Sequence, residues 1–404
     1  MMARVTVELN GRDVRAGTLW CHARRGIESA TFEYDSTYLE NDTAIELSPD
    51  LPLTPGKHHS GNRPVFLAFG DCMPDRWGRN LMLRAETHRA RASHETERAL
   101  LERDFLLGVS DVARQGALRF WVNDEPVSPS DDGVPKVVRI PSLLRDSERL
   151  EGDVQADVTD LFKAGSSLGG ARPKASVIGA NGELLIAKFP KAQETTIDDI
   201  CAWEKVALDL AALCDIRVPA SEVIRPNDKA VLLVSRFDRA HGHRIPYMSG
   251  LTAVQGDDGG QYSYLELVEF LEERGSHPEE DIRELWRRIA FSCLIGNTDD
   301  HMRNHGFLWD GQGWRLSPLF DVNPTEGTAH KHLRTSIDLD RTDTDVTVAL
   351  DACEHYRLER HEALSTITNM RKALKTWRKA ARSCGISEAS ITRMAGCFDA
   401  AANA

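Results

Sequence analysis

The sequence lacks any long hydrophobic run. No stretch of its 404 residues approaches the roughly eighteen consecutive apolar residues that a membrane span requires. The first residues, MMARVTVELN, also lack the basic stretch and apolar core of a secretory signal. Apolar residues make up 41% and charged residues 28%, shares that are typical of ordinary soluble globular proteins. Together these features predict a cytoplasmic protein with no membrane segment.

Paired cysteine motifs and an excess of basic residues are missing as well. The eight cysteines are scattered and never occur as Cys-x-x-Cys, so neither a zinc site nor a disulfide framework is indicated, and we expect buried free thiols. The formal net charge is −12, whereas a protein that coats nucleic acid needs a net basic face. Any contact with DNA would therefore be local or made by a partner.

The most informative stretch present is IGNTDDHMRNHGFL, residues 295–308. It follows a predicted helix over 279–294, in which Ile282, Leu285 and Ile289 recur at helical spacing and which Gly296 would end. Asp299 and Asn304 then have the spacing that kinases use, where an Asp accepts the proton of a substrate hydroxyl and an Asn holds magnesium. The spacing indicates phosphoryl transfer, although solvated turn residues are an open alternative.

A predicted hairpin after this loop would bring a second acidic residue back to it. HGFLW, the turn DGQG and WRLSPLF form two arms of similar length that end at Asp321. We therefore expect Asp321 to return beside residues 299–304. Oxygen ligands such as Asn304 and Asp321 suit Mg²⁺, which takes further ligands from water and phosphates. Asp299 would then act as the base.

A glycine-rich stretch, GSSLGGARPKA, lies upstream at residues 165–175 and precedes two predicted strands, 175–178 and 184–189. It matches neither a Walker A sequence nor Gly-x-Gly-x-x-Gly, and an ordinary turn is an open alternative to a phosphate-binding loop. Lys188 sits in an apolar strand, as the phosphate-gripping Lys of kinases does, and Glu204 on the next predicted helix, 196–213, would pair with it. Solvent exposure at a sheet edge is the plain alternative for Lys188.

The rest of the chain predicts the domain organisation. Residues 1–122 begin with strands, in which Asn10-Gly11 marks a tight hairpin, and form an α+β unit. Residues 123–141 have the composition of a linker, 142–238 form a small β-rich lobe, and 239–404 form a mostly helical lobe in which Ser263 and Glu266 are spaced as a capping box. A basic stripe near the end has the pattern of a solvated helix face, with substrate docking as the alternative: Arg371, Lys372, Lys375, Arg378, Lys379 and Arg382.

Several motifs together resemble the HipA family of serine/threonine kinases, the toxins of bacterial toxin–antitoxin pairs. They are SSLGGARPKA (166–175), IAKFP (186–190), SRFDR (235–239), GNTDDHMRNHGF (296–307) and SPLFDVNP (317–324). VELNGRDVRAGTL, LSPDLPLTP and QGALRFW resemble the N-terminal domain of full-length members. The resemblance implies an α+β fold in which a bilobal protein-kinase-like core follows an N-terminal β-rich domain.

The resemblance also implies roles for individual residues. Asp299 would be the catalytic base and Asn304 and Asp321 the magnesium ligands. Ser167 in the glycine-rich loop, or its neighbour Ser166, would be an autophosphorylation site that switches the kinase off, because a phosphate adds about two negative charges to the loop. The implied ATP contacts are Gly169, Gly170, Ala171, Arg172, Pro173, Lys174, Lys188, Ser235, Arg236, Phe237, His301, Met302, Arg303, Asn304, Phe320 and Asp321.

The implied partners are a HipB-like helix-turn-helix antitoxin, which would contact operator DNA, and a protein substrate such as an aminoacyl-tRNA synthetase. An acidic kinase fits a partner that supplies the basic surface. Two other functions are compatible with the residues: a kinase acting on a small molecule through the same core, and a catalytically silent corepressor that binds a helix-turn-helix protein.

Overall fold

The computed structural model describes residues 1–127, 134–152, 161, 172–195, 197–327 and 331–403. Contacts within the chain divide it into two units. The first unit comprises Met1–Ala192 and Asp238–Met248, and the second comprises Gln193–Phe237 and Ser249–Ala404. Both units mix helices and strands. The domain bounds expected from the sequence stay predictions.

The first unit is built on an antiparallel sheet with the strand order β4-β3-β2-β1-β5-β6. The predicted Asn10-Gly11 hairpin is confirmed: both residues have positive φ angles, 51° and 74°, and Leu9 pairs with Arg12. Such a turn matches the twist of the strands that it joins. The strands are β1 (Met2–Leu9), β2 (Arg12–Arg24), β3 (Ile27–Tyr34), β4 (Lys57–His59), β5 (Leu118–Val122) and β6 (Glu125–Pro126).

An aromatic cluster forms the core beneath this sheet. Phe69 is fully buried, and the centroid of its ring lies 5.5 Å from Phe32, 5.9 Å from Phe66 and 5.6 Å from Phe120, all at steep interplanar angles. Edge-to-face contacts of this kind add to the gain from burying apolar area. The helices of this part are α1 (Ser36–Leu39), α2 (Leu67–Gly70), α3 (Arg76–Ala92) and α4 (Glu102–Gly108).

The first unit also contains a second antiparallel hairpin, β7 (Lys174–Ile178) and β8 (Leu184–Lys188), in which Lys174 lies opposite Lys188. Its two strands agree with those expected from the sequence to within one residue. The remaining elements are η1 (Val137–Arg139), α5 (Ile140–Gly152), β11 (Arg239–Ala240) and β12 (His243–Arg244), and β13 (Tyr247–Ser249) ends one residue past this unit.

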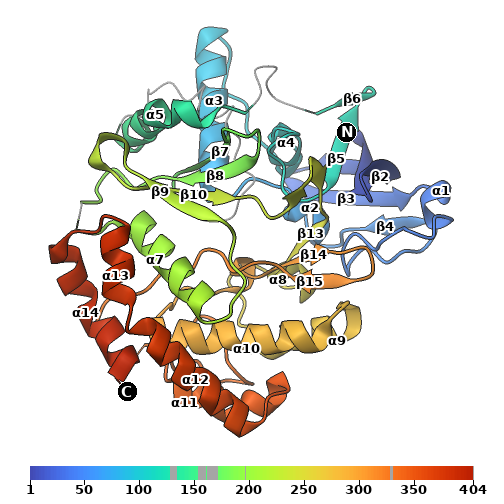
Figure 1. Ribbon diagram of the computed structural model, residues 1–404. Helices are drawn as coiled ribbons and strands as arrows, with labels where there is room; N and C mark the ends of the chain where they lie inside the picture. The colour runs from blue at the N-terminus through green and yellow to red at the C-terminus, as the bar shows by residue number, and fades with distance from the viewer. Residues whose placement is uncertain (128–133, 153–160, 162–171, 196, 328–330, 404) are drawn as a thin grey trace. The chain divides into compact units, whose positions relative to one another are not determined.

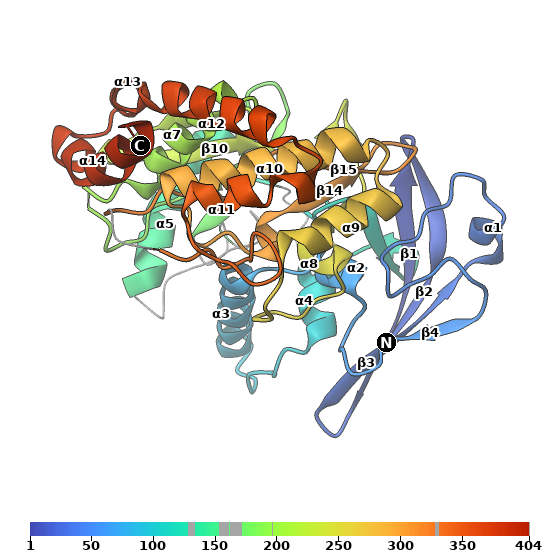
Figure 2. The same ribbon diagram turned by 90° about the horizontal axis from the view of Figure 1, so that it is seen from below.

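The second unit is mostly helical. Its central helix α10 (Pro278–Ile295) contacts α7 (Ile200–Leu213), α9 (Tyr264–Arg274), α11 (Val346–Asp351), α12 (Arg360–Leu374) and α14 (Glu388–Asn403), and α11 and α12 lie beside it in both ribbon views (Figures 1 and 2). The other elements are β9 (Ser221–Ile224), η2 (Pro226–Asp228), β10 (Val231–Ser235), α8 (Gly250–Ala253), η3 (Met302–Asn304), β14 (Gly306–Trp309), β15 (Trp314–Leu316), η4 (Cys353–Tyr356) and α13 (Trp377–Ser383).

The ends of α9 and α10 follow from the sequence. In α9, Ser263 and Glu266 form the predicted capping box. Helix α10 begins with Pro278 and three acidic residues, which suit a helix N-terminus, and it ends at Gly296, whose φ of 65° favours glycine. The end of α10 therefore determines where the loop 297–304 starts.

Other sequence-based expectations can be compared with the structure. All eight cysteines are free thiols, and only Cys384 is partly exposed. In the basic stripe, Arg378 forms an ion pair with Asp399 at 2.6 Å and Arg382 with Glu388 at 2.7 Å, which favours a solvated helix face. No helix among the described residues is long and apolar enough to cross a membrane.

Candidate active site

The loop that follows α10 places two adjacent aspartates in opposite surroundings. Asp299 has an exposed side chain, whereas Asp300 is only 3% exposed. The alternative of a solvated turn therefore does not hold for Asp300. The loop thus presents one carboxylate to solvent and buries the next.

Asp300 is buried because it has partners on several elements. Its carboxylate accepts a hydrogen bond from the Tyr264 hydroxyl at 2.7 Å and lies 3.0 Å from the Nε2 of His305, and its carbonyl accepts one from the Thr335 hydroxyl at 2.8 Å. Burial alone would raise the pKa of Asp300, but His305 and Tyr264 outweigh it and hold the pKa below its usual range. An ionised carboxylate with partners at Tyr264 and His305 therefore holds the loop in place next to Asp299.

Asn304 and the segment around Asp321 meet this loop in different ways. The Asn304 side chain is buried, and its Nδ2 donates a hydrogen bond to the carbonyl of Asp299 at 2.9 Å, which orients the amide. The backbone N–H of Asn323 donates to the Oδ1 of Asn297 at 3.3 Å, so the segment that carries Asp321 lies next to the start of the loop. Asp321 itself has a φ of 57°, a left-handed conformation that is uncommon outside glycine and recurs at functional sites.

The predicted hairpin is confirmed and leads to Asp321. Phe307 pairs with Leu316, and the N–H of Ser317 donates to the carbonyl of Gly306 at 2.8 Å, so β15 runs back along β14. The N–H of Leu319 then donates to the carbonyl of Arg217 at 2.8 Å. These backbone bonds determine the course of the chain up to the residue before Phe320.

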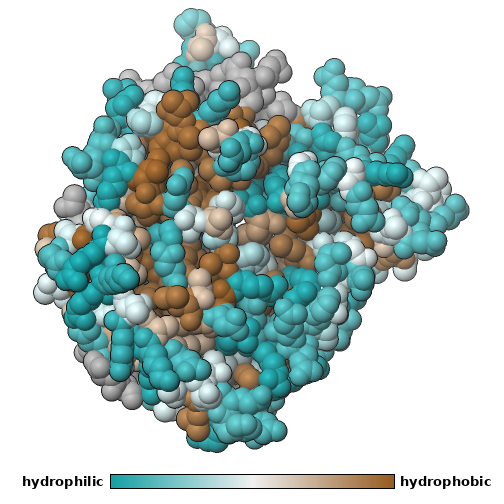
Figure 3. All heavy atoms as spheres, viewed as in Figure 1, coloured by the Kyte–Doolittle hydropathy of each residue, from teal (hydrophilic) through white to brown (hydrophobic). Residues whose placement is uncertain are grey.

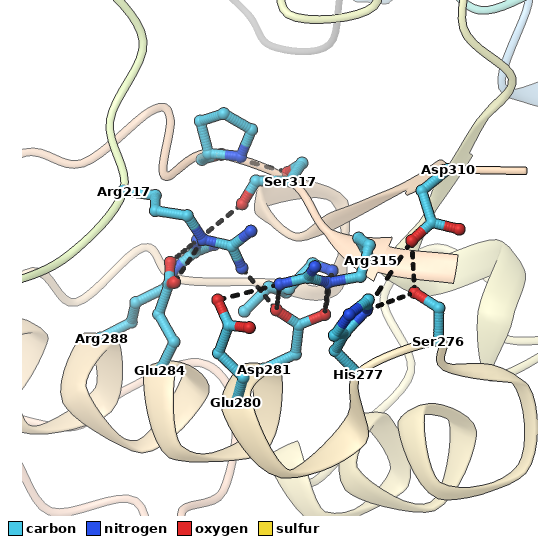
Figure 4. Close-up of polar contacts among 12 residues, drawn as sticks. Arg217, Ser276, His277, Glu280, Asp281, Glu284, Arg288, Asp310, Arg315 and Ser317 are labelled. Atoms are coloured by element: carbon cyan, nitrogen blue, oxygen red, sulfur yellow. Dashed lines mark hydrogen bonds and ion pairs between the residues drawn. The ribbon is translucent and has the colours of Figure 1, made fainter. Parts of the chain in front are cut away.

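A buried ion-pair network attaches this hairpin to α10 (Figure 4). Asp281, which is fully buried, contacts Arg315 at 2.7 Å and Arg217 at 2.5 Å and accepts a hydrogen bond from the N–H of Leu316 at 3.0 Å. Glu284 forms ion pairs with Arg217 and Arg288.

Arg288 connects the network to the chain after β15. Its Nη2 donates to the carbonyl of Ser317 at 2.6 Å, and its side chain is 1% exposed, so burial lowers its pKa. Once a charged pair is buried, removal of one partner leaves the other without compensation, which is costly. The network therefore holds β15 and the chain that follows it in one place.

The residues expected around the adenine are partly brought together. The rings of Phe237 and Phe320 have centroids 5.5 Å apart, although the two residues lie far apart in the sequence. Arg236 is buried and Ser235 is half-buried at the end of β10. Within the catalytic loop, Met302 is buried, His301 is half-buried and Arg303 is exposed, where its side chain pairs with Asp258 at 2.6 Å.

The phosphate contacts expected in the first unit are described only in part. Gly169, Gly170 and Ala171 lie outside the described residues, as do Ser166 and Ser167. Lys174 and Lys188 are buried, and because they lie opposite each other in the β7–β8 hairpin, their side chains point to one face. Asp75 pairs with Lys174 at 2.9 Å.

The remaining residues predicted for this part of the site are Arg172, Pro173 and the partner of Lys188. Arg172 is half-buried and Pro173 is buried. Glu204 is buried on α7, in the second unit. Its pairing with Lys188 stays a prediction.

Some residues that shape the site gave little signal in the sequence. Asp300, His305 and Tyr264 form its buried polar support, and the one hint is that two Asp and two His residues lie within seven positions shortly after an amphipathic helix. Gly250 is a further case: its N–H donates to the carbonyl of His305 at 2.8 Å, and a Cβ there would lie 2.7 Å from the carbonyl oxygen of Met302. Only glycine allows α8 to approach the loop this closely.

The donor set of the loop fits magnesium better than a metal held by protein alone. Within the described parts of the chain, no group of three or more His, Cys, Asp or Glu side chains is arranged to hold a metal ion. Asn304 and Asp321 each offer a side-chain oxygen, and Mg²⁺ is usually bound through one or two such groups, with water and substrate phosphates as the remaining ligands. Two oxygen donors are therefore sufficient for that ion.

Comparisons with known proteins agree with these observations. Residues 166–397 match the family model described as the HipA-like C-terminal domain, and residues 6–103 match that of the HipA N-terminal domain. The chain is 27% identical over 330 residues to a Sinorhizobium fredii protein named as a kinase, Y4mE, covering 73% of this chain and 72% of that protein. It is 27% identical over 201 residues to the toxin YjjJ of Escherichia coli, covering 47% of this chain and 44% of that protein.

A solved structure supports the same fold. HipA of Shewanella oneidensis, solved with HipB and its operator DNA, superposes with a TM-score of 0.66 at 16% sequence identity, covering 99% of this chain and 96% of that one. At this identity the match establishes the fold alone. The fold class expected from the sequence, an N-terminal domain followed by a kinase-like core, is thereby confirmed.

Proposed function

Because the chain belongs to the HipA family, we propose that it is an ATP- and Mg²⁺-dependent serine/threonine protein kinase that acts as the toxin of a toxin–antitoxin pair. The observation that carries this proposal is that the loop 299–305 exposes one aspartate and buries its neighbour. Asp299 is exposed, while its neighbour Asp300 is anchored by Tyr264, His305 and Thr335. A carboxylate on a firmly held loop is what proton acceptance from a hydroxyl requires.

The proposed reaction uses Asp299 as the base. Its carboxylate accepts the proton of a serine or threonine hydroxyl, the hydroxyl oxygen forms a bond to the γ-phosphorus of ATP, and the bond between that phosphorus and the oxygen bridging it to ADP breaks. The products are a phosphorylated side chain and ADP. Such a transfer depends mainly on positioning and on neutralising charge.

Asn304 and Asp321 are the residues that would hold Mg²⁺, which when bound supplies positive charge beside the phosphates. The hydrogen bond from the Asn304 Nδ2 to the carbonyl of Asp299 links a metal ligand directly to the base. Phe237 and Phe320 offer an apolar surface for the adenine. Arg172, Lys174 and Lys188 are proposed phosphate contacts.

Partner and substrate follow from the family. We propose a HipB-like helix-turn-helix antitoxin, since the relative from Shewanella oneidensis was solved with HipB and operator DNA. With a net charge of −12, this chain would contact DNA only through that antitoxin. An aminoacyl-tRNA synthetase is the proposed target, and phosphorylation of Ser167, with Ser166 as the alternative, is the proposed off-switch.

The test is incubation of the purified protein with ATP and Mg²⁺, alone and in a cell lysate, followed by phosphosite mapping by mass spectrometry. Asp299→Asn is expected to lower phosphate transfer by about 10²–10⁴-fold, because it removes the base. Since Asp299 is exposed, the variant should unfold at the same temperature as the wild type. Asp215→Asn, also exposed in this unit, is the matched control and should retain full activity.

Three outcomes would overturn the proposal. Unchanged transfer in Asp299→Asn would remove the base from the mechanism. Transfer to added alcohols or antibiotics, with no labelled protein, would assign a small-molecule kinase. ATP binding without any phosphorylation, together with binding to a helix-turn-helix protein, would assign a silent corepressor.

A further inference from the structure

A groove of about 1050 Å³ lies beside α9, and all of its lining residues belong to the second unit. One wall is α9, through Leu265, Glu266, Val268 and Glu269. The other wall is the segment 333–342, and His355 lies at the edge. Figure 3 shows that hydrophilic side chains cover the visible face of α9 and the adjoining end of α10.

The groove wall is attached to the catalytic loop on either side of Asp299. The N–H of Arg334 donates to the carbonyl of Thr298 at 3.2 Å, and the hydroxyl of Thr335 donates to the carbonyl of Asp300 at 2.8 Å. From the opposite wall, Tyr264 at the start of α9 donates to the carboxylate of Asp300. Arg334, which lines the groove, is therefore bonded to the residue that precedes the proposed base, whereas the residues of the loop 297–305 do not line the groove themselves.

The segment 333–342 is held firmly although it is not a regular strand. The N–H of Leu333 donates to the carbonyl of Thr342 at 2.6 Å, and that of Ile337 donates to Arg341 at 2.8 Å, which folds the segment back on itself. The N–H of Ser336 donates to the carbonyl of Tyr262 at 2.9 Å, which ties the segment to the chain just before α9. Both walls are therefore formed before any ligand binds.

The tip of this folded segment exposes an apolar residue. Leu339 is 87% exposed and lines the groove. Leu265 and Val268 line the facing wall. Burial of exposed apolar area by a partner is favourable, so this tip favours an aliphatic side chain on the ligand.

The charge of the groove is acidic. Four carboxylates line it, those of Glu266, Glu269, Glu272 and Asp340, against the cation of Arg334 and the imidazole of His355. Glu272 is paired with Arg357 at 2.8 Å, and Glu266 accepts the capping hydrogen bond from the N–H of Ser263 at 2.8 Å. Glu269 and Asp340 are both exposed. They leave an excess of negative charge for a basic ligand to meet.

We propose that this groove docks the polypeptide substrate, as a segment that carries Arg or Lys on one side of the accepting serine or threonine and an aliphatic residue near Leu339. Because one wall of the groove is hydrogen-bonded to both residues that flank Asp299, a segment that extends from the groove toward the loop would present its hydroxyl at the base. This proposal rests on the proposed kinase activity. It specifies which residues the kinase prefers around the accepting serine or threonine.

The test measures phosphorylation of short synthetic serine peptides in which Arg, Glu or Leu is placed at each position around the serine. The wild type is expected to prefer peptides with a basic residue. Glu269→Arg should lower kcat/KM for those peptides by about tenfold and raise it for acidic peptides, because it reverses one of the recognising charges. Leu339→Asp should weaken the preference for Leu, and since Leu339 is exposed the substitution should not impair folding.

Glu273→Arg is the matched control. Glu273 is exposed on the same helix but does not line the groove, so this variant makes the same change in net charge without changing peptide preference. Affinity for ATP should be the same in all variants. Equal losses in Glu269→Arg and Glu273→Arg, or an unchanged peptide preference in Glu269→Arg, would refute the docking proposal while leaving the kinase in place. A wild type that transfers no phosphate to any protein or peptide would instead refute the kinase activity itself.

Discussion

The sheet of the first unit and the catalytic loop of the second are held by different kinds of interaction. Beneath the sheet, Phe69 packs against other phenylalanines, and burial of apolar area stabilises the arrangement. Beneath the loop, Asp300 and His305 are buried polar groups with specific partners. Apolar packing tolerates small shifts of the chain, whereas a buried charge is satisfied in only a narrow range of positions.

The different interactions suit the different requirements of the sheet core and the catalytic loop. A sheet core needs stability, and many apolar side chains of about the right size supply it. A catalytic loop needs defined positions for Asp299 and Asn304, and buried hydrogen bonds to charged groups impose them at a cost in desolvation. Substitutions in the two regions should therefore differ in how they divide between lost stability and lost activity.

Phe69→Ala should give the largest loss of stability. Removal of a fully buried phenyl ring leaves a cavity, and the free energy of unfolding is expected to fall by about 4 kcal/mol, as measured by urea denaturation. Phosphate transfer per folded molecule should not change. Ile27→Ala, at a position that is 74% exposed, is the control and should change stability by less than about 0.5 kcal/mol. A loss of specific activity in Phe69→Ala would remove the contrast between the two regions.

Arg288→Met should lower both the stability of the protein and its phosphate-transfer activity. It removes a buried partner of Glu284 and the donor to the carbonyl of Ser317, so the free energy of unfolding should fall by about 3 kcal/mol. Because β15 leads to Asp321, the Mg²⁺ concentration needed for half-maximal transfer should also rise. Arg287→Met, on the more exposed side of the same helix, serves as the control. Should Arg288→Met retain the wild-type Mg²⁺ requirement, the network would be structural only.

Of these three buried substitutions, Asp300→Asn should cause the smallest loss of stability. The free energy of unfolding should fall by about 2 kcal/mol near neutral pH, because the amide keeps some of the hydrogen bonds. Since the folded-state pKa of Asp300 is depressed, its ionised form contributes stability that is present above the unfolded value of about 4 and is lost as pH falls through the folded value.

Thermal unfolding between about pH 5 and pH 2 tests this linkage. The stability of Asp300→Asn should depend less on pH than that of the wild type. Asp299→Asn, one residue away and exposed, should keep the wild-type pH profile of stability while losing activity. If the two variants had the same acid profile, Asp300 would not be the anchor of the loop.

Much of the fold and part of the site could be predicted from local patterns. The Asn10-Gly11 turn, the Ser263–Glu266 capping box and the end of α10 at Gly296 depend on neighbouring residues, and all three are confirmed. The motifs also identified the HipA family, and this is confirmed as well. Asp299, Asn304 and Asp321 were selected by spacing, and their catalytic roles stay predictions.

The buried support of the loop could not be predicted in this way. Asp300 meets Tyr264 and Thr335, which lie about 36 residues before it and 35 after it, and no local pattern says which of two adjacent aspartates will point inward. The same holds for Asp281 and Arg217 in the ion-pair network. Contacts between distant residues depend on how helices and hairpins pack.

The sequence by itself therefore determined the chemical groups, the family and the local elements, because these depend on residue type and short spacing. Tertiary structure alone decided that Asp299 faces solvent while Asp300 is buried, and that one wall of an acidic groove is hydrogen-bonded to Thr298 and Asp300. The physical reason is that burial and hydrogen bonding are properties of the packed chain: a carboxylate becomes an anchor or a base according to the partners that folding brings to it.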